Sequence, residues 1–306
     1  MKWRKLGRLY APDGSMPWAQ ASAMLPTILS LGDGRLRIYV ASTDENTVGR
    51  VGYLDVAEDD PTRVLAVAHA PVLDIGEPGC FDDNGVCPCS LVEHEGRLRL
   101  YYVGFQLHRK VPYTLFTGLA ESEDGGASFH RISRAPILDR NDRELFFRTA
   151  PFVRREGGRW RMWYIGGGGW ITVDGQTKPT YDLCHAESED GVTWSRDGQI
   201  CLEPRGDLGE FGFGRPIVLH EGGRYRLWYS IRSPSGYRMG YAESPDGLQW
   251  DRRDAEVGIG LGNQGDWDGE MICYGVVQDT PAGRFLFYNG NQYGRSGVGV
   301  AVLDVP

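Results

Sequence analysis

Carboxylates stand at the starts of several apolar segments, where acid–base chemistry could take place. Glu270 precedes an otherwise apolar run, and burying an unpaired carboxylate there is costly, so it needs either a ligand or an ion-pair partner. Asp82 and Asp83 precede an Asn-Gly pair and fit either a chemical site or a simple turn. Glu144 and Glu210 lie in more polar surroundings, where solvated side chains are the alternative. Two such carboxylates facing one cavity would make an acid–base pair.

Two arginines occupy comparable positions and point to anion binding. Arg148 and Arg215 begin the apolar segments 148–153 and 215–219. A guanidinium there could hold a carboxylate or a phosphate through two parallel hydrogen bonds. Pairing with a neighbouring acid is the alternative reading for both residues.

An internal repeat supplies the elements that must position these side chains. Each copy begins with an acidic residue, or with alanine in the last copy. One or two glycines, a basic residue, and then alternating apolar and aromatic residues follow. The five copies are residues 33–39, 95–102, 156–164, 221–229 and 282–288. A period of roughly 60 residues is typical of solenoids and propellers. The alternation and the aromatic content predict that each copy is a turn that opens a strand.

A second motif follows three of the copies, at residues 120–125, 186–194 and 242–250. Each contains an Asp-Gly pair typical of a hairpin turn, so Asp124, Asp190 and Asp246 are interpreted as structural. Another apolar strand precedes each repeat copy, which gives four strands per unit. The sequence therefore predicts one all-β domain over residues 1–306, a five-bladed β-propeller whose ring is closed by the N-terminal strand at residues 3–10.

Composition excludes several classes of protein. The chain carries 41 acidic residues against 33 Lys and Arg, a formal net charge of −8, so a nucleic-acid partner is not expected. No apolar run reaches the length of a membrane span. The N-terminal residues lack the apolar core of a signal peptide, and a cytoplasmic location is expected.

The cysteines suggest neither a disulfide framework nor a metal centre. Their spacing is irregular and no CxxC or HxxxH pattern accompanies it, at positions Cys80, Cys87, Cys89, Cys184, Cys201 and Cys273. We therefore expect free thiols, no metal and no cofactor.

The segments 81–86, 148–151, 214–216, 266–274 and 288–291 resemble the five-bladed propeller glycosidase superfamily, which includes glycoside hydrolase families 32, 43 and 130. The chain is most similar to glycosidase-like proteins of bacterial polysaccharide and secondary-metabolite gene clusters. This resemblance covers the whole chain. It implies an axial pocket in which carboxylates from different blades act on a small sugar conjugate, which could be anionic or nucleotide-linked.

The resemblance also implies which residues reach that pocket. Asp82 would be the base, Glu270 the acid, and Glu144 a further catalytic carboxylate. Residues mapping to the same face would bind substrate, namely Gln20, Asp83, Arg148, Glu210, Arg215, Asp268, His108, Trp170, Asn289, Asn291 and Tyr293, with Asp44 and Arg232 on the same loops. Trp170 follows four glycines, which suggests a flexible loop carrying an aromatic platform.

One departure from the superfamily pattern leaves the chemistry open. Families 32 and 43 place an aspartate on the inner strand of the first blade, whereas residues 18–26 here contain no carboxylate. Another blade could supply the base. Alternatively, the reaction is a non-hydrolytic transfer or cyclisation, or the protein is a non-catalytic propeller that binds a carbohydrate or metabolite.

Overall fold

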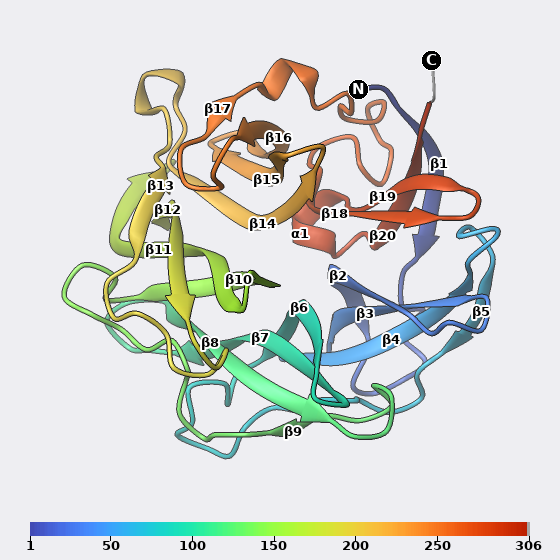
Figure 1. Ribbon diagram of the computed structural model, residues 1–306, viewed down its shortest axis with the longest axis horizontal. Coiled ribbons are helices and arrows are strands. Elements are labelled where there is room, and N and C mark those ends of the chain that lie inside the picture. Colours follow the sequence, from blue (N-terminus) through green and yellow to red (C-terminus); the bar gives the residue numbers. More distant parts are fainter. Residues whose placement is uncertain (305–306) are drawn as a thin grey trace.

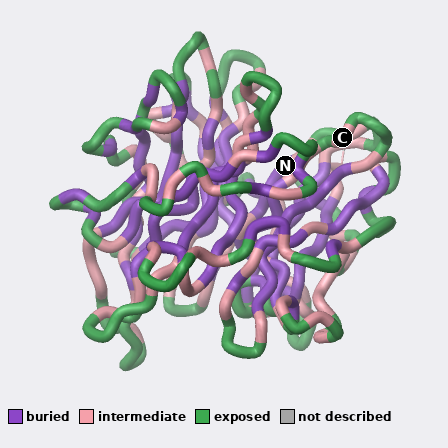
Figure 2. Tube along the Cα trace, turned by 90° about the horizontal axis from the view of Figure 1, so that it is seen from below, coloured by how far each residue is buried: buried purple, intermediate pink, exposed green. Residues whose placement is uncertain are grey.

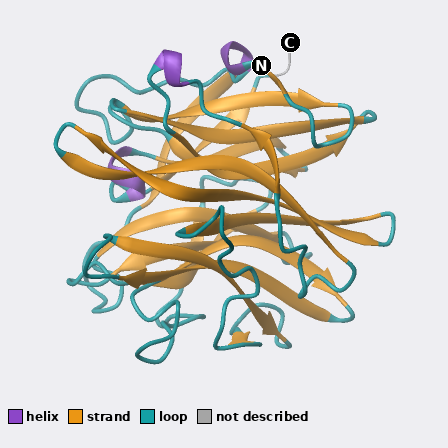
Figure 3. Ribbon diagram, turned by 90° about the vertical axis from the view of Figure 1, so that its left-hand side faces the viewer, coloured by secondary structure: helices purple, strands orange, loops and turns teal. Residues whose placement is uncertain are grey.

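The computed structural model describes residues 1–304, and these are almost entirely β-strands joined by turns (Figure 3). Three sheets have four strands. The first consists of β2 (Ala21–Ser30), β3 (Arg35–Thr43), β4 (Gly49–Ala57) and β5 (Val64–Val67). The second consists of β14 (Gly212–Glu221), β15 (Arg224–Ser233), β16 (Gly236–Ser244) and β17 (Asp251–Arg252). The third consists of β18 (Cys273–Thr280), β19 (Gly283–Asn289), β20 (Val298–Leu303) and β1 (Trp3–Tyr10).

The fourth sheet has eight strands and consists of two four-stranded units. One unit is β6 (Val86–His94), β7 (Arg97–Leu107), β8 (Tyr113–Ser122) and β9 (His130–Arg131); the other is β10 (Phe147–Glu156), β11 (Arg159–Val173), β12 (Gln176–Ser188) and β13 (Gln199–Leu202). Only two parallel residue pairs between β10 and β8 join the units. Short helical turns at α1 (Asn291–Gly294), Gly206–Leu208 and Asp254–Glu256 complete the described chain.

The N-terminal segment pairs where the repeat predicts. β1 runs antiparallel to β20, with Trp3 opposite Leu303 and Tyr10 opposite Val298. The strands β2, β6, β10, β14 and β18 lie nearest the middle of the molecule, and the two chain ends lie together at its rim (Figure 1). The prediction of an all-β chain is therefore confirmed.

A bulge interrupts four of these inner strands. Leu25, Ala150, Arg215 and Tyr274 have φ between +27° and +55°, and the strand register shifts beside each of them. Bulges bend a strand and change the direction of its side chains. In this chain they turn these four residues toward the cavities described below.

The strands form the buried interior, and the cysteines form no disulfide bonds among the described residues. Burial is concentrated in the strands, whereas the connecting turns are exposed (Figure 2). All six cysteines are free, as predicted; four are buried and two are partly exposed.

Asp124, Asp190 and Asp246 each accept two backbone N–H bonds within their own turns, which agrees with the structural role expected of them. Among residues 1–304, no helix is long and apolar enough to cross a membrane.

Glycines on the third strand of several units allow an aromatic ring to lie flat on the backbone. A Cβ on Gly118 would lie 2.3 Å from the Tyr102 ring, and a Cβ on Gly52 would lie 2.3 Å from Trp18. The Tyr102 ring is fully buried and its hydroxyl is hydrogen-bonded, so it has no room to shift.

We therefore expect Gly118→Ala to lower the free energy of unfolding by about 1–3 kcal/mol, the usual cost of overpacking a core. Gly260→Ala is the matched control, because its Cβ would meet nothing within 4 Å. Urea unfolding measures both. Equal midpoints for the two variants would contradict the packing argument.

Candidate functional site

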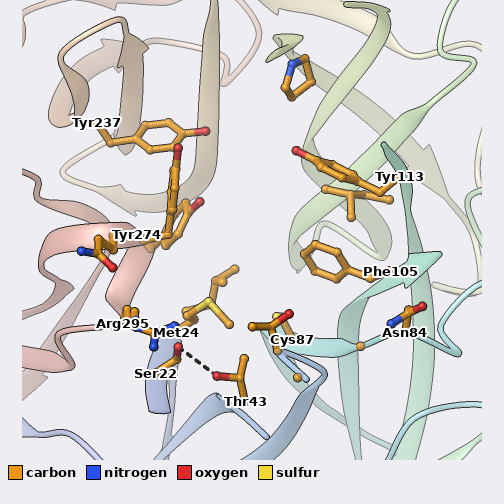
Figure 4. Close-up of a pocket in the computed structure, with 18 of the residues that line it drawn as sticks. Ser22, Met24, Thr43, Asn84, Cys87, Phe105, Tyr113, Tyr237, Tyr274 and Arg295 are labelled. Carbon is orange, nitrogen blue, oxygen red and sulfur yellow. Dashed lines mark hydrogen bonds between the residues drawn. The ribbon is translucent and has the colours of Figure 1, made fainter. Parts of the chain in front are cut away.

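The largest cavity lies where the loops and strand ends of several sheets meet. It has a volume of about 670 Å³, within the range of small-molecule sites. Phe105 and Tyr113 form one wall, Tyr237 and Tyr274 face them, and Ser22 and Thr43 lie at the base with a hydrogen bond between them (Figure 4). The aromatic walls suit the apolar faces of a ring-shaped ligand.

The charged lining of this cavity is entirely cationic. Lys178, Arg232 and Arg295 line it, and no Asp or Glu of residues 1–304 is among its lining residues. This contrasts with the chain as a whole, in which acids outnumber bases by 41 to 33. The cavity therefore favours an anionic ligand.

Arg232 is the central cation. Arg232 is only 7% exposed. Within the described chain, its guanidinium takes part in no ion pair. Its surroundings are aromatic instead, with ring centroids 5.4–5.9 Å away at Phe211, Tyr237, Tyr181 and Tyr293. Cation–π contacts offset part of the cost of burying a guanidinium, but a buried cation without a counter-ion remains unfavourable. An anion entering the cavity would supply that counter-ion.

The cavity tyrosines are hydrogen-bond donors rather than nucleophiles. Burial raises the pKa of Tyr181, Tyr237 and Tyr274 above the ordinary value, so these phenols stay protonated at neutral pH. A protonated phenol is a poor nucleophile but a good donor to a ligand oxygen.

A narrow inner chamber of about 80 Å³ continues the cavity toward the inner strands, and Arg215 lines it. Arg215 is 1% exposed. It donates to Thr27 Oγ1 at 2.8 Å, to the Cys89 carbonyl at 3.2 Å and to the Tyr274 carbonyl at 3.3 Å. Burial lowers the pKa of Arg215 to about 10, which leaves it charged. Because its bonds reach β2, β6 and β18 from β14, Arg215 holds the inner strands together.

The predicted carboxylates lie elsewhere and share one arrangement. Asp82, Glu144 and Asp268 are each buried and each accepts a hydrogen bond from the hydroxyl of the tyrosine 20 residues later. These bonds are Tyr102 to Asp82 at 2.9 Å, Tyr164 to Glu144 at 2.7 Å and Tyr288 to Asp268 at 2.8 Å.

A cation also binds the acid of each pair, and we call each set of acid, tyrosine and cation an anchor. Arg131 lies 2.7 Å from Asp82, Arg148 lies 3.0 Å from Glu144, and Lys5 lies 2.6 Å from Asp268. The fourth acid, Glu210, instead accepts two bonds of 2.8 Å from Arg252. None of the four acids lines the main cavity or its inner chamber. The structure therefore places these acids, together with Arg148, in ion pairs that tie the strands of each unit together.

Asp82, the expected base, and Glu270, the expected acid, have different surroundings. Asp82 is 0% exposed and held by Tyr102 and Arg131, whereas Glu270 is exposed and lines neither the cavity nor its inner chamber. Asp82 lines neither of these two cavities either.

Most of the remaining predicted residues have hydrogen-bond partners within the protein. Asn289 is buried, accepts from the Leu25 N–H and donates to the carbonyls of Ala23 and Gly297. Asn291 Oδ1 accepts from the N–H groups of Glu270 and Met271. Three others form short-range contacts: Gln20 with the Met16 carbonyl, Asp83 with the Gly79 N–H and His108 with Thr114.

The glycine run before Trp170 is strand rather than flexible loop. Residues 166–169 lie within β11, and a Cβ on Gly167 or Gly168 would come within 2.2 Å of a neighbouring backbone oxygen. The glycines therefore permit close backbone approach. Trp170 packs against Tyr113 and Phe147, with centroid distances of 5.4 and 5.0 Å, and supports the cavity wall from behind.

Two residues of the predicted loops do line the cavity, namely Tyr293 and Arg232. Sequence reasoning missed Lys178, Arg295, Tyr181 and Tyr237. Lys178 and Arg295 lie in polar segments without periodicity, so no sequence signal marked them. Tyr237 follows the β15–β16 turn, and its place opposite β8 emerges only from the packing of separate sheets.

No protein-family model matches the chain. Among solved structures, it is similar to a putative glycosidase from Bacteroides thetaiotaomicron (TM-score 0.70, 18% identity, 99% of this chain and 96% of that one) and to a thermostable family-43 glycoside hydrolase (TM-score 0.68, 16% identity, 94% and 91%). It is also similar to the Bombyx mori GH32 beta-fructofuranosidase BmSUC1 (TM-score 0.63, 14% identity), of which it covers 61%. The chain thus has the fold of these glycoside hydrolases.

Two sequence relatives are closer in identity. They are the Mycobacterium tuberculosis proteins named "Uncharacterized protein MT1551" and "Uncharacterized protein Rv1502", each 35% identical over 304 residues that span 99% of this chain and 100% of the relative. Identity of this extent over the full length indicates common descent and a shared fold. The chain therefore belongs to the family of these two M. tuberculosis proteins.

Proposed function

We propose that this protein is a five-bladed propeller, closed by β1, whose axial cavity binds a small sugar conjugate that carries an anionic group. The four-stranded units and the β1–β20 pairing support the five blades and the closure. The observation that carries the binding role is Arg232, a buried cation with no ion-pair partner in the described chain that lines a cavity without acids.

The sugar part of the proposal rests on the fold and the cavity walls. Solved structures with this fold include glycoside hydrolases, and one structure of a BmSUC1 mutant is a complex with sucrose. Phe105 and Tyr113 opposite Tyr237 and Tyr274 offer aromatic faces to a sugar ring, and the tyrosine hydroxyls offer hydrogen bonds (Figure 4).

Binding is favoured over hydrolysis because the cavity lacks the groups that hydrolysis needs. Glycoside hydrolysis by the usual routes takes two carboxyl groups, about 5–5.5 Å apart in retaining enzymes and about 6.5–9.5 Å apart in inverting ones. No carboxylate of residues 1–304 lines this cavity. The raised pKa values of Tyr181, Tyr237 and Tyr274 disfavour a tyrosine nucleophile. This is the non-catalytic binding alternative raised by the sequence.

Calorimetric titration with matched pairs of sugars tests the proposal. Glucose, galactose and mannose 1-phosphates and glucuronic acid are compared with the corresponding neutral sugars. At least one anionic member should bind ten-fold or more tightly than its neutral partner. The difference should shrink as salt rises, since the more exposed cations Lys178 and Arg295 are screened.

Nitrophenyl glycosides of the same sugars test for hydrolysis, and we expect no turnover above the rate in buffer. Turnover that survives removal of trace contaminants would overturn the binding role. Equal affinity for anionic and neutral sugars would overturn the anion site.

A further inference from the structure

A smaller cavity of about 180 Å³ adjoins the main one. It lies between the β11–β12 turn and the β15–β16 turn, and Val173, Gln176, Phe211 and Ser233 help to line it. By the volume that a water occupies in the liquid, it has room for about six waters, which is comparable to one flat heterocyclic ring.

The two cavities share part of their lining, and that shared part is cationic. Lys178, Arg232, Tyr237 and Tyr293 line both cavities. Within residues 1–304 neither Lys178 nor Arg232 takes part in an ion pair, although most cations elsewhere on the strands are paired. A ligand that passes from one cavity to the other would thus place its middle portion beside two unneutralised cations.

Such a ligand needs charge in its middle and less charge at both ends. The main cavity offers aromatic walls and hydroxyl groups, and the side cavity offers the ring of Phe211 and the amide of Gln176. Asp174 also lines the side cavity and is exposed. Its carboxylate repels phosphate but accepts hydrogen bonds from hydroxyl or amino groups. A nucleoside would satisfy this end, because its base can stack on an aromatic ring and its ribose hydroxyls are donors.

We propose that the sugar conjugate is a nucleoside diphosphate sugar. The sugar occupies the main cavity, the diphosphate lies against Lys178 and Arg232, the nucleobase occupies the side cavity, and the ribose lies at its rim beside the exposed Asp174. This inference rests on the proposed binding function and names the chemical class of its ligand. Two cations on one side of a diphosphate form charge-assisted hydrogen bonds, which are about twice as strong as neutral ones.

Calorimetry with sugar-free probes tests the nucleoside part independently of which sugar is recognised. The probes are UDP, ADP, GDP and CDP, with inorganic pyrophosphate as the reference. We expect at least one nucleoside diphosphate to bind ten-fold or more tightly than pyrophosphate and to compete with the hexose 1-phosphate that binds best. If none binds more tightly than pyrophosphate, the nucleoside site is overturned.

Variants separate the two cavities. Val173 lines only the side cavity, so Val173→Trp should fill it, weaken the nucleoside diphosphate at least ten-fold and change hexose 1-phosphate affinity less than two-fold. Ile171→Trp, at an exposed position on the same strand that lines neither cavity, should change neither. Lys178→Met should weaken both ligands, whereas Lys110→Met, on an exposed loop, should weaken neither.

The outcomes distinguish this inference from the function it rests on. Hexose 1-phosphate binding that persists while nucleoside diphosphates fail overturns the inference alone. Equal weakening of both ligands by Val173→Trp also overturns the inference alone. Failure of every anionic probe in the wild-type protein overturns the proposed function as well.

Discussion

Asp82→Ala is expected to lower the free energy of unfolding by about 3 kcal/mol. The substitution leaves the Tyr102 hydroxyl without its acceptor and Arg131 without its counter-ion. Removing one partner of a buried ion pair costs about 3–5 kcal/mol, and the lower end applies here because the Arg131 side chain is 21% exposed. Urea unfolding measures the change through the midpoint, provided that the slope stays constant.

Two other acids that the sequence singled out serve as controls. Asp83→Ala removes one acceptor of a backbone N–H at a partly exposed turn and should cost at most about 1 kcal/mol. Glu270→Gln alters an exposed side chain and should stay within about 0.5 kcal/mol of wild type. If Asp82→Ala unfolded at the wild-type midpoint, the acid–tyrosine–cation anchor would have no structural importance, and a ligand-facing role for Asp82 would return.

The strands were predictable because they follow from short-range patterns. Arg97, Arg159 and Arg224 each begin a strand, as the repeat predicts. A turn followed by period-two alternation is a local signal that tertiary packing rarely overrides. The pairing of residues 3–10 with the last strands was also predictable, because the final unit otherwise lacks its fourth strand.

The roles of the acids were not predictable from local pattern. Asp82, Glu144 and Asp268 look alike in the sequence whether they face a ligand or a tyrosine. The distinguishing signal is the constant separation of 20 residues from Tyr102, Tyr164 and Tyr288. That separation spans one hairpin of the repeat, so each acid binds a tyrosine of its own four-stranded unit. A regular offset between acid and tyrosine in a repeat protein thus indicates an internal anchor.

The cavity was unpredictable for a different reason. Its cations come from the β11–β12 hairpin, the end of β15 and the segment after α1. These segments are far apart in the sequence and meet only when separate sheets pack. The sequence marked Arg232 as a loop residue of the correct face, but its burial among aromatic rings depends on Phe211, Tyr181 and Tyr293 from three other segments.

Arg232→Met is expected to weaken the best anionic sugar ligand at least 100-fold. Methionine roughly keeps the length and apolar contacts of the side chain but removes the charge and its donors. Losing one partner of a desolvated charge pair costs about 2–5 kcal/mol of binding free energy, and about 2.7 kcal/mol corresponds to 100-fold. Calorimetric titration measures the affinity, and Arg109→Met on an exposed loop is the control that should leave it unchanged.

Although Arg232→Met weakens binding, it should not lower the free energy of unfolding. Without ligand, Arg232 is a buried cation with no ion-pair partner among residues 1–304, so replacing it with an apolar side chain removes a desolvation cost. The free energy of unfolding of ligand-free Arg232→Met should therefore equal or exceed that of wild type, even though binding is lost. A variant that both fails to bind and unfolds more than about 1 kcal/mol more easily would show that Arg232 holds the fold together. Loss of binding without such a loss of stability would show that Arg232 serves the ligand rather than the fold.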